Sequence, residues 1–148
     1  MQKQQLIQAC RDYLKDKINS LNTIINEVTE SSNSESKSSA GDKHETSKAM
    51  MQLEIEKLGT QLKEAEELSA DFEKINFNKP FQTIEQGSLV ETNRGWFLIA
   101  SSIGKLTIDE KIVFVISNRS PLAVAFAGKQ HKDSLSFNGV EYVIERVF

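Results

Sequence analysis

The chain has 148 residues, 39% of them hydrophobic, and a formal net charge of −3 at pH 7, which allows about one domain plus an appendage. Its overall acidity argues against a general nucleic-acid binder, which would carry a basic face. No apolar run approaches the roughly 18 residues that a membrane span needs, and the N-terminus lacks the pattern of a signal peptide, so we expect a cytoplasmic protein.

The first predicted element is a long helix from residue 3 to about 30. Its apolar residues recur at helical spacing and form a stripe wide enough to bury against one partner helix. Cys10 falls in this stripe and is the single cysteine of the chain, so we expect a buried packing role rather than a reactive thiol. The residues that lie seven apart in the stripe are Ile7, Leu14, Leu21 and Val28.

The next segment, TESSNSESKSSAGD, is rich in serine and has no periodicity, which predicts a break in the helix and a reversal of the chain. A second apolar stripe then runs from Met51 to Phe72 in alternating steps of four and three residues, the pattern of a coiled-coil seam. Two helices of similar length joined by such a break predict an antiparallel hairpin.

Asp42 and Glu45 lie three residues apart where the second helix is expected to start. They have the spacing of a capping pair, with aspartate in place of serine or threonine. A carboxylate pair at a bend can also keep the tip in solution or bind a metal ion. The residues alone leave these interpretations open.

After INFNKPF, where Pro80 ends the helical pattern, short β-rich runs alternate with turns. One short helix interrupts them: Ser120 stands at the N-cap, Pro121 at the first helical position and Gly128 at the C-terminal stop. Trp96 alternates with strand residues and is expected in the core. The predicted strands are SLVET (88–92), WFLIAS (96–101), KIVFVIS (111–117), SLSF (134–137) and VEYVIERVF (140–148).

The predicted fold class is therefore α+β. An N-terminal antiparallel α-helical coiled-coil finger covers residues 1–78, with its tip loop near 31–45. A small antiparallel β-sheet domain with one short helix covers residues 79–148.

This order of elements, together with two short motifs, resembles the bacterial Gre transcript-cleavage factors, in which the C-terminal domain has an FKBP-like fold. The family's tip has the form G-D-x-x-E-N, and this chain has Gly41, Asp42 and Glu45 in the matching positions. The family's C-terminal domain has an SP-x-A segment that opens a short helix and a Gly-Lys pair that closes it. The matching residues here are Ser120, Pro121, Ala123, Gly128 and Lys129.

The resemblance implies that Ser120, Pro121, Gly128 and Lys129 help to bind bacterial RNA polymerase, while the coiled coil enters the secondary channel of that enzyme. On the residues alone, Lys129 is equally well explained as a charge that suits the C-terminal end of the helix dipole. No membrane contact and no sequence-specific DNA contact are expected, and we expect a monomer.

The resemblance also implies a role for the tip carboxylates at a second Mg²⁺ that is shared with the polymerase. Asp42 would contact the metal, and Glu45 would orient or deprotonate the attacking water. Mg²⁺ prefers oxygen ligands and keeps several waters, so one or two added carboxylates suffice. The chain would then not be an enzyme itself; it would stimulate the polymerase to cut backtracked RNA near its 3′ end.

One departure from the family's pattern lies directly after the tip motif. Where the family continues with Asn and, shortly after, an aromatic residue, this chain has Thr46, Ser47 and Lys48. Two alternatives to a cleavage factor therefore remain open. One is a Gre-like regulator that occupies the same channel without cutting; the other is an unrelated coiled-coil interaction module.

Overall fold

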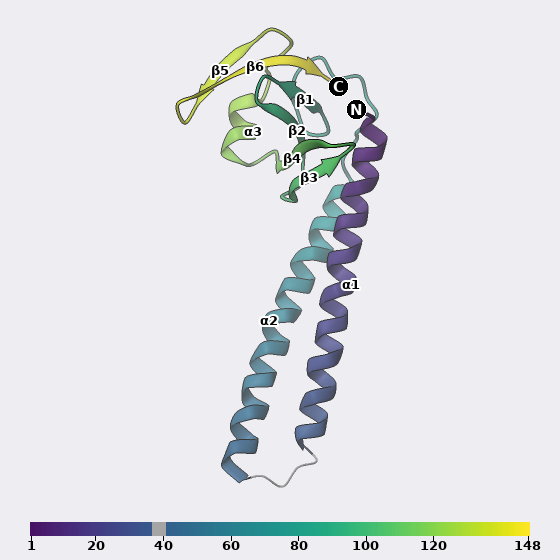
Figure 1. The fold of residues 1–148 in the computed structure, drawn as a ribbon, viewed down its shortest axis with the longest axis vertical. Coiled ribbons are helices and arrows are strands. Elements are labelled where there is room, and N and C mark those ends of the chain that lie inside the picture. The colour runs from purple at the N-terminus through teal and green to yellow at the C-terminus, as the bar shows by residue number, and fades with distance from the viewer. Residues whose placement is uncertain (37–40) are drawn as a thin grey trace. The chain divides into compact units, whose positions relative to one another are not determined.

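The computed structural model describes the backbone of residues 1–36 and 41–148 and the side chains of residues 1–33 and 45–148. Within these residues the predicted α+β class is confirmed. Two long helices, α1 (Lys3–Ser36) and α2 (Gly41–Glu73), precede a six-stranded, mostly antiparallel sheet and the short helix α3 (Pro121–Phe126) (Figure 1). None of the described helices combines the length and the apolar character of a membrane span.

The chain packs as two compact units. We call Met1–Arg11 with Ala70–Phe148 the sheet unit and Asp12–Ser69 the finger unit. The predicted domain division at residue 78 stays a prediction, and each unit is described by itself.

Helix α1 is longer than predicted, because the serine-rich segment from Thr29 to Ser36 continues it. This segment contains neither glycine nor proline, and its serine, asparagine and glutamate residues each cost less than about 0.7 kcal/mol relative to alanine in a helix. Extending a helix that already exists is also much easier than starting one. The predicted break is therefore wrong up to Ser36, and its next residues, 37–40, lie outside the described chain. Helix α2 begins at Gly41, close to the start expected from Asp42, so positions 41–45 of the predicted tip loop are helical as well.

The finger unit is held together along the two predicted stripes. Leu21 of α1 forms a buried cluster with Leu58 and Ala65 of α2. Val28, seven residues after Leu21 in α1, lines a groove together with Met51, seven residues before Leu58 in α2. Later residues of one helix meet earlier residues of the other, so the hairpin is antiparallel, as predicted. The partly buried residues around the cluster are Ile18, Ile25, Val28 and Leu62.

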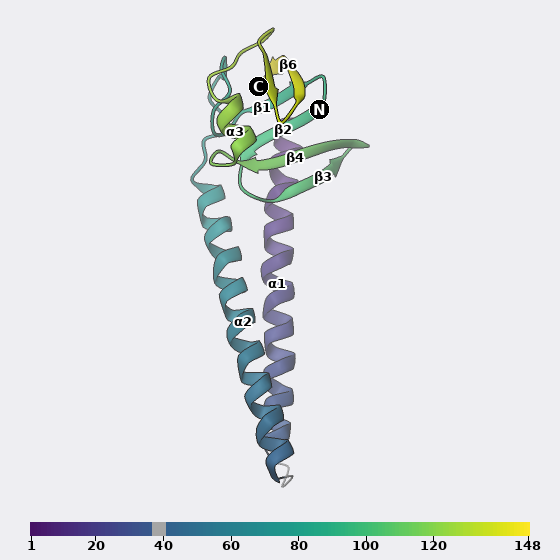
Figure 2. The ribbon, with the colours of Figure 1, turned by 90° about the vertical axis from the view of Figure 1, so that its left-hand side faces the viewer.

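The sheet unit contains all six strands that the described residues form, in the order β3-β4-β2-β1-β6-β5. Figure 2 shows β3 beside β4 at one edge of this order. Strand β3 is not among the predicted strands, because its sequence GKLTI contains glycine and lysine, two residues that are depleted in strands. Pairing with β4 along its whole length stabilises β3 nonetheless. The strands are β1 (Leu89–Thr92), β2 (Gly95–Ala100), β3 (Gly104–Ile108), β4 (Lys111–Ser117), β5 (Ser134–Phe137) and β6 (Val140–Val147).

The sheet is mostly antiparallel, as predicted, but one pair of strands, β2 with β4, is parallel. The chain leaves β2, forms β3 at the outer edge and returns through the two residues Asp109 and Glu110 into β4. Strand β4 is thereby inserted between β3 and β2. If β3 is not predicted, β2 and β4 look like consecutive strands of a hairpin, which would be antiparallel. This is why the sequence does not indicate their parallel pairing.

The core of the sheet unit lies between the sheet and α3. Phe126 of α3 is fully buried, and its ring centroid lies 5.3 Å from that of Phe97 and 5.4 Å from that of Tyr142. Trp96, expected in the core, is only half-buried, because it stands at the start of β2, where its ring stacks on Phe148 at 6.0 Å. The buried cluster consists of Ile84, Val90, Phe97, Ile99, Ala123, Phe126 and Ile144.

The ends of the two long helices are also buried in the sheet unit. Cys10 of α1 has no exposed surface, which confirms its predicted packing role. Lys3 donates hydrogen bonds to the carbonyl oxygens of Phe77 at 2.9 Å and Phe148 at 3.0 Å, and its ammonium group lies 4.2 Å from the centre of the Phe81 ring. These contacts tie the beginning of α1 to two later segments of the same unit.

Candidate functional site

The first group of predicted site residues lies at the start of α2. Because this helix begins at Gly41, position 42 falls in its first turn and position 45 opens its second. Positions three residues apart are neighbours on a helix, so the backbone places these two on the same side. The Glu45 side chain is exposed. The side chains of Asp42 and His44 lie outside the described residues, so capping and metal contact by Asp42 stay predictions.

The carboxylates of the described chain do not form a metal site by themselves. Among the described residues, no group of three or more His, Cys, Asp and Glu side chains is placed to hold a metal ion. Two carboxylates leave most of the octahedral shell of Mg²⁺ to be filled by waters or by another molecule. A magnesium ion held by Asp42 and Glu45 would need ligands from a partner, and this site stays a prediction.

The second group of predicted site residues surrounds α3. The Ser120 hydroxyl accepts a hydrogen bond from the backbone N–H of Ala123 at 3.3 Å and donates one to the carbonyl of Ser117 at 2.8 Å. Ser120 is thus the N-cap, as predicted, and exposed Pro121 begins the helix. The local role of Ser120 is confirmed, whereas its contact with a partner stays a prediction.

The end of α3 is fixed by the segment that precedes β1. Gly128 has a φ of 79°, the left-handed conformation that commonly follows the end of a helix. Its N–H donates to the carbonyl of Ile84 at 2.9 Å, and the carbonyl of Lys129 accepts from the N–H of Ile84 at 2.8 Å. The Lys129 side chain is half-buried and follows the helix directly, so both the docking and the dipole interpretation stay open.

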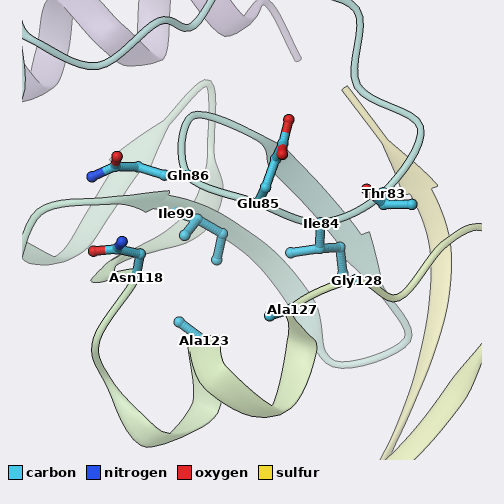
Figure 3. A pocket seen from close by; sticks show the side chains of 9 residues that line it. All are labelled: Thr83, Ile84, Glu85, Gln86, Ile99, Asn118, Ala123, Ala127 and Gly128. Atoms are coloured by element: carbon cyan, nitrogen blue, oxygen red, sulfur yellow. The ribbon is translucent and has the colours of Figure 1, made fainter.

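A pocket of about 330 Å³ lies against these residues in the sheet unit (Figure 3). Ile84 and Ile99 form an aliphatic floor, and Ala123 of α3 and the following cap residue Ala127 form a wall whose small side chains leave the space open. The amide side chains of Gln86 and Asn118, both exposed, line the same side of the pocket in Figure 3. The other residues that line it are Thr83, Glu85 and Gly128.

An apolar floor with polar groups at its mouth is the usual make-up of a site that receives one side chain or a small ligand. Here it suits an aliphatic side chain whose neighbours hydrogen-bond to the two amides. Gln86 and Asn118 are not among the predicted site residues, because they come from two loops more than thirty residues apart in the chain and only the fold places both at this pocket. No local pattern in the sequence singles them out.

No family model and no curated protein matches the sequence. Among solved structures, the chain aligns with one described as the transcription factor Gfh1, at 15% sequence identity and over 97% of this chain and 91% of that chain. The TM-score of this alignment is 0.35, which is too low to carry an argument about function. The resemblance to the Gre factors therefore rests on the sequence motifs and the order of the elements, and the FKBP-like fold stays a prediction.

Proposed function

We propose that this chain binds bacterial RNA polymerase and inserts its helical hairpin into the secondary channel, where it promotes cleavage of backtracked RNA. The observation that carries the proposal is the position of Gly41, Asp42 and Glu45 at the very start of α2, after the long helix α1. A hairpin that begins its second helix with the G-D-x-x-E motif is the arrangement that the Gre factors, which this sequence resembles, use to deliver carboxylates.

In this proposal Asp42 contacts a second Mg²⁺ of the polymerase, and Glu45 orients or deprotonates the attacking water. A second metal ion supplies charge stabilisation for the attacking and leaving oxygens of the phosphodiester. The Glu45 carboxylate is exposed, so this chain does not carry the cost of burying an unpaired charge before it meets its partner. The polymerase supplies the remaining ligands and the RNA, so the chain is an activator and not itself the enzyme.

We assign docking to the surface around α3. Pro121 is exposed at the start of this helix, and Lys129 adds a positive charge after its end. The pocket floored by Ile84 and Ile99 offers a place for one aliphatic side chain of the partner. Side chains that fill such pockets often provide most of the binding energy of an interface.

A second candidate function is regulation without cleavage. It is favoured by Thr46 and Ser47, which stand where the Gre pattern continues with Asn and an aromatic residue. The Asn and the aromatic residue of the Gre pattern belong to the part of the hairpin that would meet the catalytic centre. A protein that occupies the channel but lacks these two residues would block or modulate transcription and leave the RNA intact.

The test is RNA cleavage in stalled, backtracked elongation complexes of the cognate polymerase at millimolar Mg²⁺. We expect the wild-type chain to accelerate release of short 3′ fragments, and the double variant Asp42→Asn with Glu45→Gln to bind equally well without accelerating cleavage. Glu66→Gln with Glu67→Gln is the matched control, since it removes two exposed carboxylates from the same helix at a distance from its start.

Each outcome of this test selects one candidate. Cleavage by the tip double variant would show that the tip assignment is wrong. A stable complex without faster cleavage by the wild-type chain would support the regulator. The absence of any complex with the core polymerase would favour the unrelated interaction module.

A further inference from the structure

The finger unit carries an open groove of about 530 Å³ between its two helices, at some distance in sequence from the buried Leu21 cluster. Three of its lining residues come from α1 and three from α2. They are Glu27, Val28, Ser31, Met50, Met51 and Glu54.

The apolar part of this groove continues onto exposed residues. Met50 is 66% exposed, and Leu53, three residues later on α2, is 65% exposed. Ile24 is 42% exposed and lies one helical turn before Val28, so it is the neighbour of Val28 on α1. Single exposed hydrophobic residues are common on soluble proteins, but a contiguous group around a groove marks an interaction site.

The charged part of the groove is acidic on both walls. Glu27 stands on α1 and Glu54 on α2, and neither forms an ion pair within the described part of the chain. The surrounding stretches, 24–31 and 47–57, contain four glutamates against two lysines. An apolar centre between two unpaired carboxylates is complementary to an apolar side chain between two cations.

We propose that this groove binds a partner helix that presents an aliphatic or aromatic side chain flanked by Lys or Arg. The apolar side chain lies against Val28, Met50 and Met51, and the two cations pair with Glu27 and Glu54. Methionine is unbranched and adapts its shape to what it binds, which suits Met50 to this task. A second copy of the finger is a poorer occupant, because a symmetric contact brings Glu27 and Glu54 towards the same glutamates of the other copy. The inference goes beyond the proposed function, since neither Asp42 and Glu45 nor α3 takes part.

The chain contains three methionines, Met1, Met50 and Met51, so ¹³C-methyl labelling of methionine gives two probes in the groove and one control outside it. The full chain is titrated with a synthetic amphipathic helical peptide of leucine and lysine, and separately with the same peptide carrying glutamate in place of lysine. We expect the lysine peptide to shift the Met50 and Met51 signals in a saturable way and to leave Met1 unchanged. The glutamate peptide is expected to shift none of them.

The variant Glu27→Gln with Glu54→Gln is expected to weaken binding of the lysine peptide about fivefold, since it removes two exposed ion pairs, each of which contributes little. Glu66→Gln with Glu67→Gln, on the same finger but outside the groove, is expected to leave the affinity unchanged. Absence of any shift, equal shifts with both peptides or an unchanged affinity of the groove variant would each overturn the proposal. A shift of Met50 that depends on protein concentration without peptide would overturn it in favour of a second copy.

Discussion

The two compact units of this chain bury their hydrophobic residues to very different extents. Among the described residues, nineteen buried hydrophobic residues belong to the sheet unit, whereas four, namely Leu14, Leu21, Leu58 and Ala65, belong to the finger unit. The residues packed around the finger cluster are only partly buried. Because apolar stabilisation grows with the area removed from water, the sheet unit contributes the larger stability per residue.

The unit that contributes most of the stability is therefore not the unit that carries the proposed tip chemistry. The finger has one seam between two helices, so most of its surface is free to meet other molecules. The tip motif and the acidic groove both belong to the finger unit, whereas the buried cluster around Phe126 belongs to the sheet unit. Segments with few buried contacts open at low free energy, and interaction surfaces are often drawn from them. Changes at the tip are therefore expected to leave the sheet unit intact.

The largest expected effect concerns the thiol of Cys10 in the sheet unit. Burial raises the pKa of this thiol from 9.0 to about 12, so its reactive thiolate is about a thousandfold scarcer than that of an exposed cysteine near neutral pH. We expect alkylation by iodoacetamide at pH 8 to be at least about a thousandfold slower in the folded chain than in urea. Alkylation at the rate of a free thiol would contradict the burial of this helix end.

The same thiol makes stability depend on pH. Since its pKa is raised in the folded state, the folded chain keeps the proton between pH 9.0 and about pH 12, where the unfolded chain loses it. The unfolded state therefore binds fewer protons in that range, and the free energy of unfolding falls as the pH rises through it. The variant Cys10→Ala is expected to lose this part of the pH dependence.

The next effect is a large loss of stability in the sheet unit. Phe126→Ala removes a fully buried ring that contacts Phe97 and Tyr142, and we expect it to lower the free energy of unfolding by about 3–5 kcal/mol. Urea denaturation followed by the fluorescence of Trp96, the single tryptophan, measures this loss. Val124→Ala on the same helix is the control; at 62% exposure it is expected to change stability by less than about 0.5 kcal/mol. Equal effects of the two substitutions would refute the packing of α3.

A smaller loss is expected in the finger unit. Leu58→Ala removes a residue that is 6% exposed from a seam with few other buried residues, and we expect a cost of about 2–3 kcal/mol. Hydrogen exchange is expected to speed up within Asp12–Ser69, while the unfolding transition that Trp96 reports changes less than with Phe126→Ala. Leu53→Ala, at 65% exposure on the same helix, is the control. Faster hydrogen exchange confined to the strands of the sheet unit would show that the two units are not separately stabilised.

The same contrast decides how much of the fold the sequence predicts. The seam of the finger follows a period of three and four residues, and this periodicity alone identifies Leu58, Leu62 and Ala65 as residues that face the partner helix. The cap of α3 is equally local, since Ser120 and Pro121 carry their signals within two positions. Such features need no knowledge of the rest of the chain.

The parts that the sequence does not predict depend on distant contacts. Strand β3 has weak strand propensity and exists through its pairing with β4, which in turn makes the β2–β4 pair parallel. The pocket at α3 combines Gln86 with Asn118, whose proximity follows only from the folded sheet. Helix α1 extends to Ser36 because a helix already formed tolerates residues that would not start one.

The smallest expected effect concerns the turn that inserts β4 into the sheet. Asp109 and Glu110, the two residues between β3 and β4, have φ angles of 48° and 65°, as a type I′ turn requires at both positions. Glutamate tolerates this conformation poorly, whereas glycine adopts it without steric cost, and Asp-Gly is a favoured sequence for this turn. We therefore expect Glu110→Gly to raise the free energy of unfolding by about 0.5–1 kcal/mol, because the removed strain exceeds the entropy that glycine adds to the unfolded chain. Glu110→Ala removes the same charge but keeps the strain, so it is expected to bring no such gain. If Glu110→Gly and Glu110→Ala changed the urea midpoint equally, the effect would come from the lost charge. The turn between β3 and β4 would then not be strained at Glu110.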